Sequence, residues 1–203
     1  MNKIGYIAVI ALVIGGIVGY NLRGSPPIQK PESSDKAMSK EEAQPGSKEW
    51  KIKNAMSAAT EAVAKDATVL DWPEKEGGDL TELKKGTSDW TCLPDYPSSP
   101  GNDPICVDKQ GVKWFQAYMT QKEPNLTQAG IGYMLQGGSD ASNTDPFATK
   151  PAEGEDWVTA PAHVMIFPVG KLDPAVYGTD YKKGTSWIMF AGTPYEHLMV
   201  PVK

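Results

Sequence analysis

The sequence is poor in the residues that most catalytic and metal sites require. Its 203 residues contain only two cysteines and two histidines, with no C-x-x-C and no paired His–Cys spacing. These absences argue against a redox dithiol and against a zinc site. A G-x-S-x-G elbow and a G-K-[ST] phosphate loop are also missing. We therefore assign no catalytic residue and favour a binding or structural role over catalysis.

An excess of basic residues is lacking too. Twenty Lys and Arg stand against 25 Asp and Glu, which gives a formal net charge of −5. A nucleic-acid partner would require a basic face for its phosphates, so we expect none. Seventeen prolines and twenty glycines predict long connections and modest regular structure.

One long hydrophobic run occurs, at residues 4–20 (IGYIAVIALVIGGIVGY), and it carries no charge. Its length is at the lower edge for crossing a bilayer. The same pattern, with Lys3 before it, is typical of a signal peptide, but no A-x-A cleavage signal follows. We favour residues 1–23 as an uncleaved signal anchor, with a cleaved signal peptide as the alternative.

The rest of the chain divides into a linker and a domain. Residues 24–48 are rich in Pro, Ser, Lys and Glu and hold almost no large apolar residue. Such a segment cannot bury enough surface to offset its ordering entropy, so we predict a flexible tether. Residues 49–203 are long enough to bury the core of one globular domain.

The periodicity of the domain changes from helical to strand-like along the chain. Residues 52–63 and 109–122 have apolar positions at helical spacing, the first stretch rich in alanine and the second ended by Pro124. Short apolar runs predict strands at 68–71, 130–135, 163–169, 186–192 and 197–202. The fold class predicted is α+β, with two helices packed on a mostly antiparallel β-sheet. Long loops are expected at 73–107 and 136–157.

Cys92 and Cys106 flank a loop rich in proline and glycine. Behind an export signal such a pair favours a disulfide over free thiols. Closing the loop would stabilise the fold by about 3 kcal/mol. Lys3 and Arg23 flank the hydrophobic run and favour opposite orientations in the membrane. The expected disulfide favours the orientation that places the domain outside the cytoplasm. We expect a single-pass protein of the inner or cytoplasmic membrane, with its domain in the periplasm or outside the cell. Its partner is the membrane, through the N-terminal helix, and the sequence identifies no protein partner.

Several longer motifs carry a resemblance. W-T-C-L-P-D (90–95), N-D-P-x-C-x-D (102–108), Y-M-L-Q-G-G-S-D-A-S-N-T-D-P (133–146) and G-T-P-Y-x-H-L-M-V-P-V (192–202) resemble a family of uncharacterised exported bacterial proteins. The resemblance covers nearly all of the domain. It implies export and a single domain, and it transfers no catalytic residue.

Each of the two histidines is followed two positions later by methionine, in His163-Val-Met165 and His197-Leu-Met199. In a strand, residues i and i+2 point to the same face, so each pair presents an imidazole beside a thioether. This soft ligand set suits copper, and Cu(I) above all. The two H-x-M pairs are therefore our candidate metal ligands.

The two histidines are 34 residues apart, which is similar in part to periplasmic copper chaperones, whose pattern ends in H-x-M after a long gap from an earlier histidine. Those proteins also carry a methionine about a dozen residues after the first ligand, whereas the corresponding stretch here, residues 171–175, has none. The alternative is packing, because methionine commonly fills gaps in cores and a lone buried histidine is usually a hydrogen-bonded structural residue.

The most polar, glycine-bearing stretch of the domain is residues 136–146. Asp140, Ser142, Asn143 and Asp145 could supply oxygen ligands to calcium, although their spacing does not fit an EF-hand. The same residue types form Asx turns and helix caps, which is the reading we prefer, so calcium is a weaker candidate than copper. An enzyme using one histidine as a base beside this loop is a third possibility. Five aromatic residues could line a ligand groove, although at this density we expect most of them to lie in the core: Trp72, Trp90, Tyr96, Trp114 and Trp157.

Overall fold

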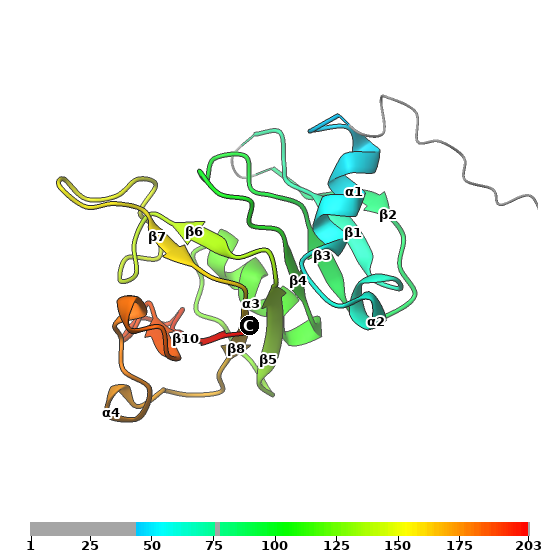
Figure 1. The fold of residues 1–203 in the computed structure, drawn as a ribbon. Coiled ribbons are helices and arrows are strands. Elements are labelled where there is room, and N and C mark those ends of the chain that lie inside the picture. Colours follow the sequence, from blue (N-terminus) through cyan, green and yellow to red (C-terminus); the bar gives the residue numbers. More distant parts are fainter. Residues whose placement is uncertain (1–43, 76–77, 203) are drawn as a thin grey trace, which may run out of the picture. The chain divides into compact units, whose positions relative to one another are not determined.

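A computed structural model of the chain describes residues 44–75 and 78–202 (Figure 1). The predicted signal anchor and all but the end of the predicted tether lie outside the described residues. No helix in the described ranges is long and apolar enough to cross a membrane. The described part is a mixed α+β domain in which strands predominate over helices, as the predicted fold class requires in outline.

The elements in chain order are α1 Lys48–Met56, α2 Glu61–Ala64, β1 Thr68–Asp71, β2 Thr81–Lys84, β3 Thr91–Leu93, β4 Ile105–Val107, α3 Lys109–Met119, β5 Gly130–Met134, β6 Gly138–Asp140, β7 Val158–Ala160, β8 His163–Phe167, α4 Pro174–Tyr177, a 3-10 turn η1 Tyr181–Lys183, β9 Trp187–Met189 and β10 His197–Pro201. All five predicted strands are present. The predicted loops also contain strands that the sequence did not reveal, namely β2, β3 and β4 in 73–107 and β6 in 136–157.

Eight of these strands form one sheet in the order β2-β1-β3-β4-β5-β8-β10-β9, and β6 pairs with β7 in a separate hairpin. Every pairing in the large sheet is antiparallel except β1 with β3, which is parallel. The mostly antiparallel sheet of the prediction is thus confirmed. Strands β5, β8, β10 and β9 all come from the C-terminal part of the chain and lie next to one another.

The two longer helices cover opposite faces of the sheet. Cys106 packs with the buried alanines of α1, such as Ala55, whereas its neighbours Ile105 and Val107 pack in a second core with Trp114 of α3. Because successive residues of a strand point to opposite faces, α1 and α3 must lie on opposite sides of β4. Figure 1 shows α1 beside β1 and β3, and α3 beside β4 and β5.

The predicted first helix, 52–63, is divided in two. Ser57 caps α1, and its hydroxyl donates to the carbonyl of Asn54. The next carbonyls serve another part of the fold, since Leu135 N donates to Ala58 O at 2.9 Å and Gln136 Nε2 donates to Ser57 O at 3.1 Å. These contacts hold the chain between α1 and α2 against the end of β5. The break in the helix could not be predicted from the alanine content alone.

Helix α3 begins and ends by local rules. The Asp108 carboxylate accepts hydrogen bonds from the backbone N–H groups of Gln110 and Gly111, which satisfies two free donors of the first turn. The helix ends at Met119, earlier than the predicted Lys122. Gln121 has φ of 53°, in the left-handed region where a helix cannot continue.

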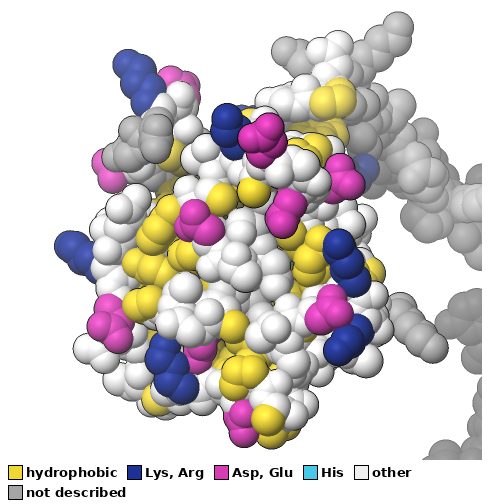
Figure 2. Space-filling view, turned by 90° about the vertical axis from the view of Figure 1, so that its left-hand side faces the viewer, with side chains coloured by type: hydrophobic (Ala, Val, Ile, Leu, Met, Phe, Trp, Pro, Cys, Tyr) yellow, Lys and Arg dark blue, Asp and Glu magenta, His cyan; other side chains and the backbone are white. Residues whose placement is uncertain are grey.

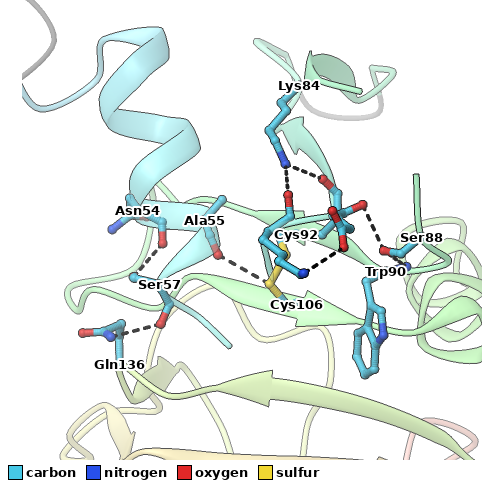
Figure 3. The surroundings of a disulfide bond; sticks show 12 residues. Asn54, Ala55, Ser57, Lys84, Ser88, Trp90, Cys92, Cys106 and Gln136 are labelled. Carbon is cyan, nitrogen blue, oxygen red and sulfur yellow. Dashed lines mark hydrogen bonds and ion pairs between the residues drawn. A yellow bond between two sulfur atoms is a disulfide. The ribbon is translucent and has the colours of Figure 1, made fainter. Parts of the chain in front are cut away.

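The predicted disulfide is present, joining Cys92 to Cys106 (Figure 3). The two cysteines stand directly opposite in β3 and β4 and are fully buried. The sulfur of Cys106 lies 3.5 Å from the carbonyl oxygen of Ala55 in α1. The bond therefore ties two central strands together beneath α1, on the face of the sheet away from α3.

Candidate functional site

The register of β5, β8, β10 and β9 places the H-x-M residues on one face of the sheet, which we call the inner face. Met165 is directly opposite Met199 across β8 and β10. His163 and His197 are two residues away along their own strands and so share that face. Trp114 of α3 contacts His197 with ring centroids 5.2 Å apart, which identifies the inner face as the one that α3 covers.

A cavity of about 170 Å³ lies over the inner face. Its wall includes both histidines and four methionines: His163, His197, Met134, Met165, Met189 and Met199. All four of the predicted metal ligands are therefore brought to one cavity. Its space is sufficient for a few water molecules or for a metal ion and its ligands.

His163 is fully buried in this wall. Its Nδ1 lies 2.7 Å from the carbonyl oxygen of Pro161. Because a carbonyl only accepts, Nδ1 carries the proton and Nε2 holds the lone pair. That Nε2 is buried without a hydrogen-bond partner. A buried polar atom left unpaired costs about 1–3 kcal/mol, so a ligand that bonded to this nitrogen would remove that cost.

His197 repeats this arrangement in β10. Its Nδ1 donates to the carbonyl oxygen of Tyr195 at 3.0 Å, which again leaves the lone pair on Nε2. Burial lowers the pKa of His197 to about 4, with a smaller contribution from His163, while the Tyr195 hydrogen bond opposes the shift. Burial also lowers the pKa of His163. Both rings are thus neutral at neutral pH, which is the state that binds metal.

The methionines approach the histidines closely. Met134 of β5 is directly opposite His163 of β8. The Met134 sulfur and the His163 Cε1 both lie 3.6 Å from the point where a Cβ on Gly138 would stand. Because Gly138 of β6 has no side chain, Met134 and His163 can approach each other at this point. On the other side of the cavity, Met189 of β9 is directly opposite His197.

Carboxylates are less well placed for metal binding. Within residues 44–75 and 78–202, no three side chains of His, Cys, Asp or Glu form a group that could hold an ion. The cavity wall does include Asp103 and Asp140. Burial raises the pKa of Asp140 to about 6, against the opposing hydrogen bonds from the backbone of Ser142 and Ala141.

The predicted ligand loop after β6 makes turns in the structure. The carboxylate of Asp140 accepts from Ser142 N, and that of Asp145 accepts from Phe147 N, as in Asx turns. Asn143 accepts from the indole N–H of Trp187 at 3.0 Å. Of the four predicted loop residues, Asp140 alone reaches the cavity, while Asn143 holds a tryptophan of its wall.

Aromatic rings cover the cavity. Trp114 stacks on Tyr118 at 5.3 Å and meets His197 edge to face. The Phe190 ring contacts the His197 ring with centroids 5.5 Å apart, and the φ of Phe190, 54°, lies in the left-handed region, which is costly for a residue other than glycine.

No histidine is visible on the face drawn in Figure 2, where separate apolar patches alternate with charged side chains. The aromatic lining residues are Trp72, Tyr96, Trp114, Phe115, Tyr118, Trp187 and Phe190.

Sequence reasoning found part of this site and missed the rest. Trp72, Tyr96 and Trp114 do line the cavity, whereas Trp90 packs with Tyr133 in the core around the disulfide. Met134 and Met189 were missed as possible ligands. Both lie within predicted strands, but their proximity to a histidine depends on strand pairing, which a single sequence does not disclose.

Comparison of the chain with protein-family models, with curated proteins and with solved structures gives no significant match.

Proposed function

We propose that this protein is a membrane-tethered, extracytoplasmic binding protein that holds copper as Cu(I) in the cavity over the inner face. The observation that carries the proposal is the state of the two histidines. Each donates Nδ1–H to a backbone carbonyl, keeps its lone pair on Nε2, and lies in the wall of a cavity that four methionines also line. Metal-binding histidines commonly fix their second nitrogen in this way.

The ligand types favour Cu(I) over the common alternatives. Thioether sulfur and neutral imidazole are soft or intermediate donors, which suit Cu(I), whereas calcium and magnesium require oxygen. The cavity offers four thioethers and two imidazoles but only two carboxylates, from Asp103 and Asp140. The hydrophobic run at 4–20 and the Cys92–Cys106 disulfide support a place outside the cytoplasm.

A melting experiment tests the proposal. Full-length protein in a mild non-ionic detergent is heated with and without Cu(I), which ascorbate keeps reduced. Since only the folded chain brings β8 and β10 together, free Cu(I) at about 100 times Kd should add about 2.7 kcal/mol of stability and raise Tm by several degrees. His163→Gln and His197→Gln should each reduce that rise, whereas Met119→Leu, outside the cavity, should preserve it.

The packing alternative predicts a different result. If the histidines are only structural, each His→Gln variant lowers Tm equally with and without Cu(I), and copper leaves the wild-type melting curve unchanged. An unchanged wild-type curve would refute copper binding.

A second candidate function is supported by one observation. Asp140, with its pKa near 6, lines the same cavity as both histidines, so proton-transfer groups converge there. This favours an enzyme that uses a histidine and Asp140 on a small substrate. The purified protein should then retain one organic molecule. If the Asp140→Asn variant loses that molecule and treatment with a Cu(I) chelator does not remove it, the enzyme function is favoured over copper binding.

A further inference from the structure

We infer that the cavity holds two Cu(I) ions, in two half-sites that each combine one histidine with two methionines. The first half-site is His163, Met134 and Met165, and the second is His197, Met189 and Met199. This inference rests on the proposed copper function and extends it to two residues, Met134 and Met189, that lie outside the H-x-M pairs.

The distance between the histidines separates them into two sites. His163 is paired with Pro201, four residues from His197 in β10. At about 3.3 Å per residue, the two histidines are displaced by about 13 Å along the strands. Side chains in strands stand roughly perpendicular to the sheet. To bind one shared ion, both imidazoles would have to tilt toward each other along the strands.

Each histidine instead has two methionines beside it. His163 has Met165 two positions along its strand and Met134 directly across in β5. His197 has Met199 two positions along its strand and Met189 directly across in β9. Directly opposite residues have Cβ atoms about 5 Å apart, well within the reach of a flexible thioether. Two thioethers and one imidazole give each half-site three donors, a set that suits Cu(I).

The two half-sites are related by an approximate twofold axis. Met165 and Met199 face each other across β8 and β10, and the axis passes between them. Rotation about it exchanges His163 with His197. It also exchanges Met134 with Met189, because each is the cross-strand partner of its histidine. The repeated ligand set is therefore a property of the strand pairing, and the Met165–Met199 pair lies where the two half-sites meet.

A titration determines the number of ions. Full-length protein in mild detergent is titrated with Cu(I) under anaerobic conditions, in competition with a chromogenic Cu(I) chelator, and with Ag(I) as a redox-inert probe. We expect two ions per chain for wild type. Met134→Leu and Met189→Leu keep the side-chain volume but remove a donor, so each should reduce the count to one, and the double variant should bind none.

Met119→Leu is the matched control, since Met119 is 45% exposed and outside the cavity. It should retain two ions. A count of one that is insensitive to Met134→Leu and Met189→Leu but is abolished by either His→Gln variant would overturn the two-site inference and leave the copper function standing. Wild-type protein that binds no ion would overturn both. Far-ultraviolet circular dichroism of each variant verifies that the fold is retained.

Discussion

Phe190 provides a sharp test of the cavity wall because its backbone and its side chain have opposing effects. The ring is 3% exposed, so Phe190→Ala should cost about 3–5 kcal/mol in packing. The backbone has φ of 54° and is held there by hydrogen bonds from its N–H to Asn143 O and from Thr193 Oγ1 to its carbonyl. A left-handed residue with a Cβ carries about 1–2 kcal/mol of strain, which alanine keeps and glycine removes.

Glycine also costs about 0.5–1 kcal/mol relative to alanine through the entropy of the unfolded chain. The balance leaves Phe190→Gly more stable than Phe190→Ala by about 0.5–1 kcal/mol. Phe167, fully buried in the regular strand β8, is the control, and there alanine should be more stable than glycine by a similar amount. Urea unfolding of the four variants measures both differences. The same sign at both positions would refute the strained conformation of Phe190.

Two further predictions concern the disulfide and pH. Replacing Cys92 and Cys106 together by alanine should lower the free energy of unfolding by about 3 kcal/mol, and thiol labelling of unreduced, denatured wild type should detect no free cysteine; two labelled thiols would contradict the bond. In metal-free protein, the unfolded chain protonates His197 near pH 6.5 but the folded chain only near pH 4. The stability of wild type relative to His197→Gln should therefore fall by about 3 kcal/mol as pH decreases through that window. Asp140, whose raised pKa has the opposite sign, is common to both proteins and cancels; a difference that does not vary with pH would contradict a neutral, buried His197.

Strands with strong apolar runs were predictable from the sequence, and those without were not. His163–Phe167 and His197–Pro201 consist mainly of large apolar residues, so local composition identifies them. Strands β3 and β4 have three residues each and lie among prolines, and they are joined by the disulfide and packed against α1. Such strands form because of tertiary context, which local propensity does not contain.

The apolar runs of the later strands do not show which of their two faces is buried. The inner face is covered by α3 and buried, whereas Ile131 of β5, on the other face, is 38% exposed. The candidate ligands show the same limit of sequence reasoning. The i, i+2 spacing of each H-x-M pair predicts a shared face from local geometry. The meeting of both pairs with Met134 and Met189 required the register of four strands.

The pairing of Met165 with Met199 across β8 and β10 has a consequence for insertions and deletions. A single residue removed inside β8 or β10 would change the parity of that strand and carry its histidine and methionine to the opposite face. Between β8 and β9 the chain forms the short helices α4 and η1, in which no residue is buried. A change of length in this connection does not alter which face each residue of β8 or β10 points to. We therefore expect it to accept a tag or a reporter with less effect on the cavity than an insertion within a strand.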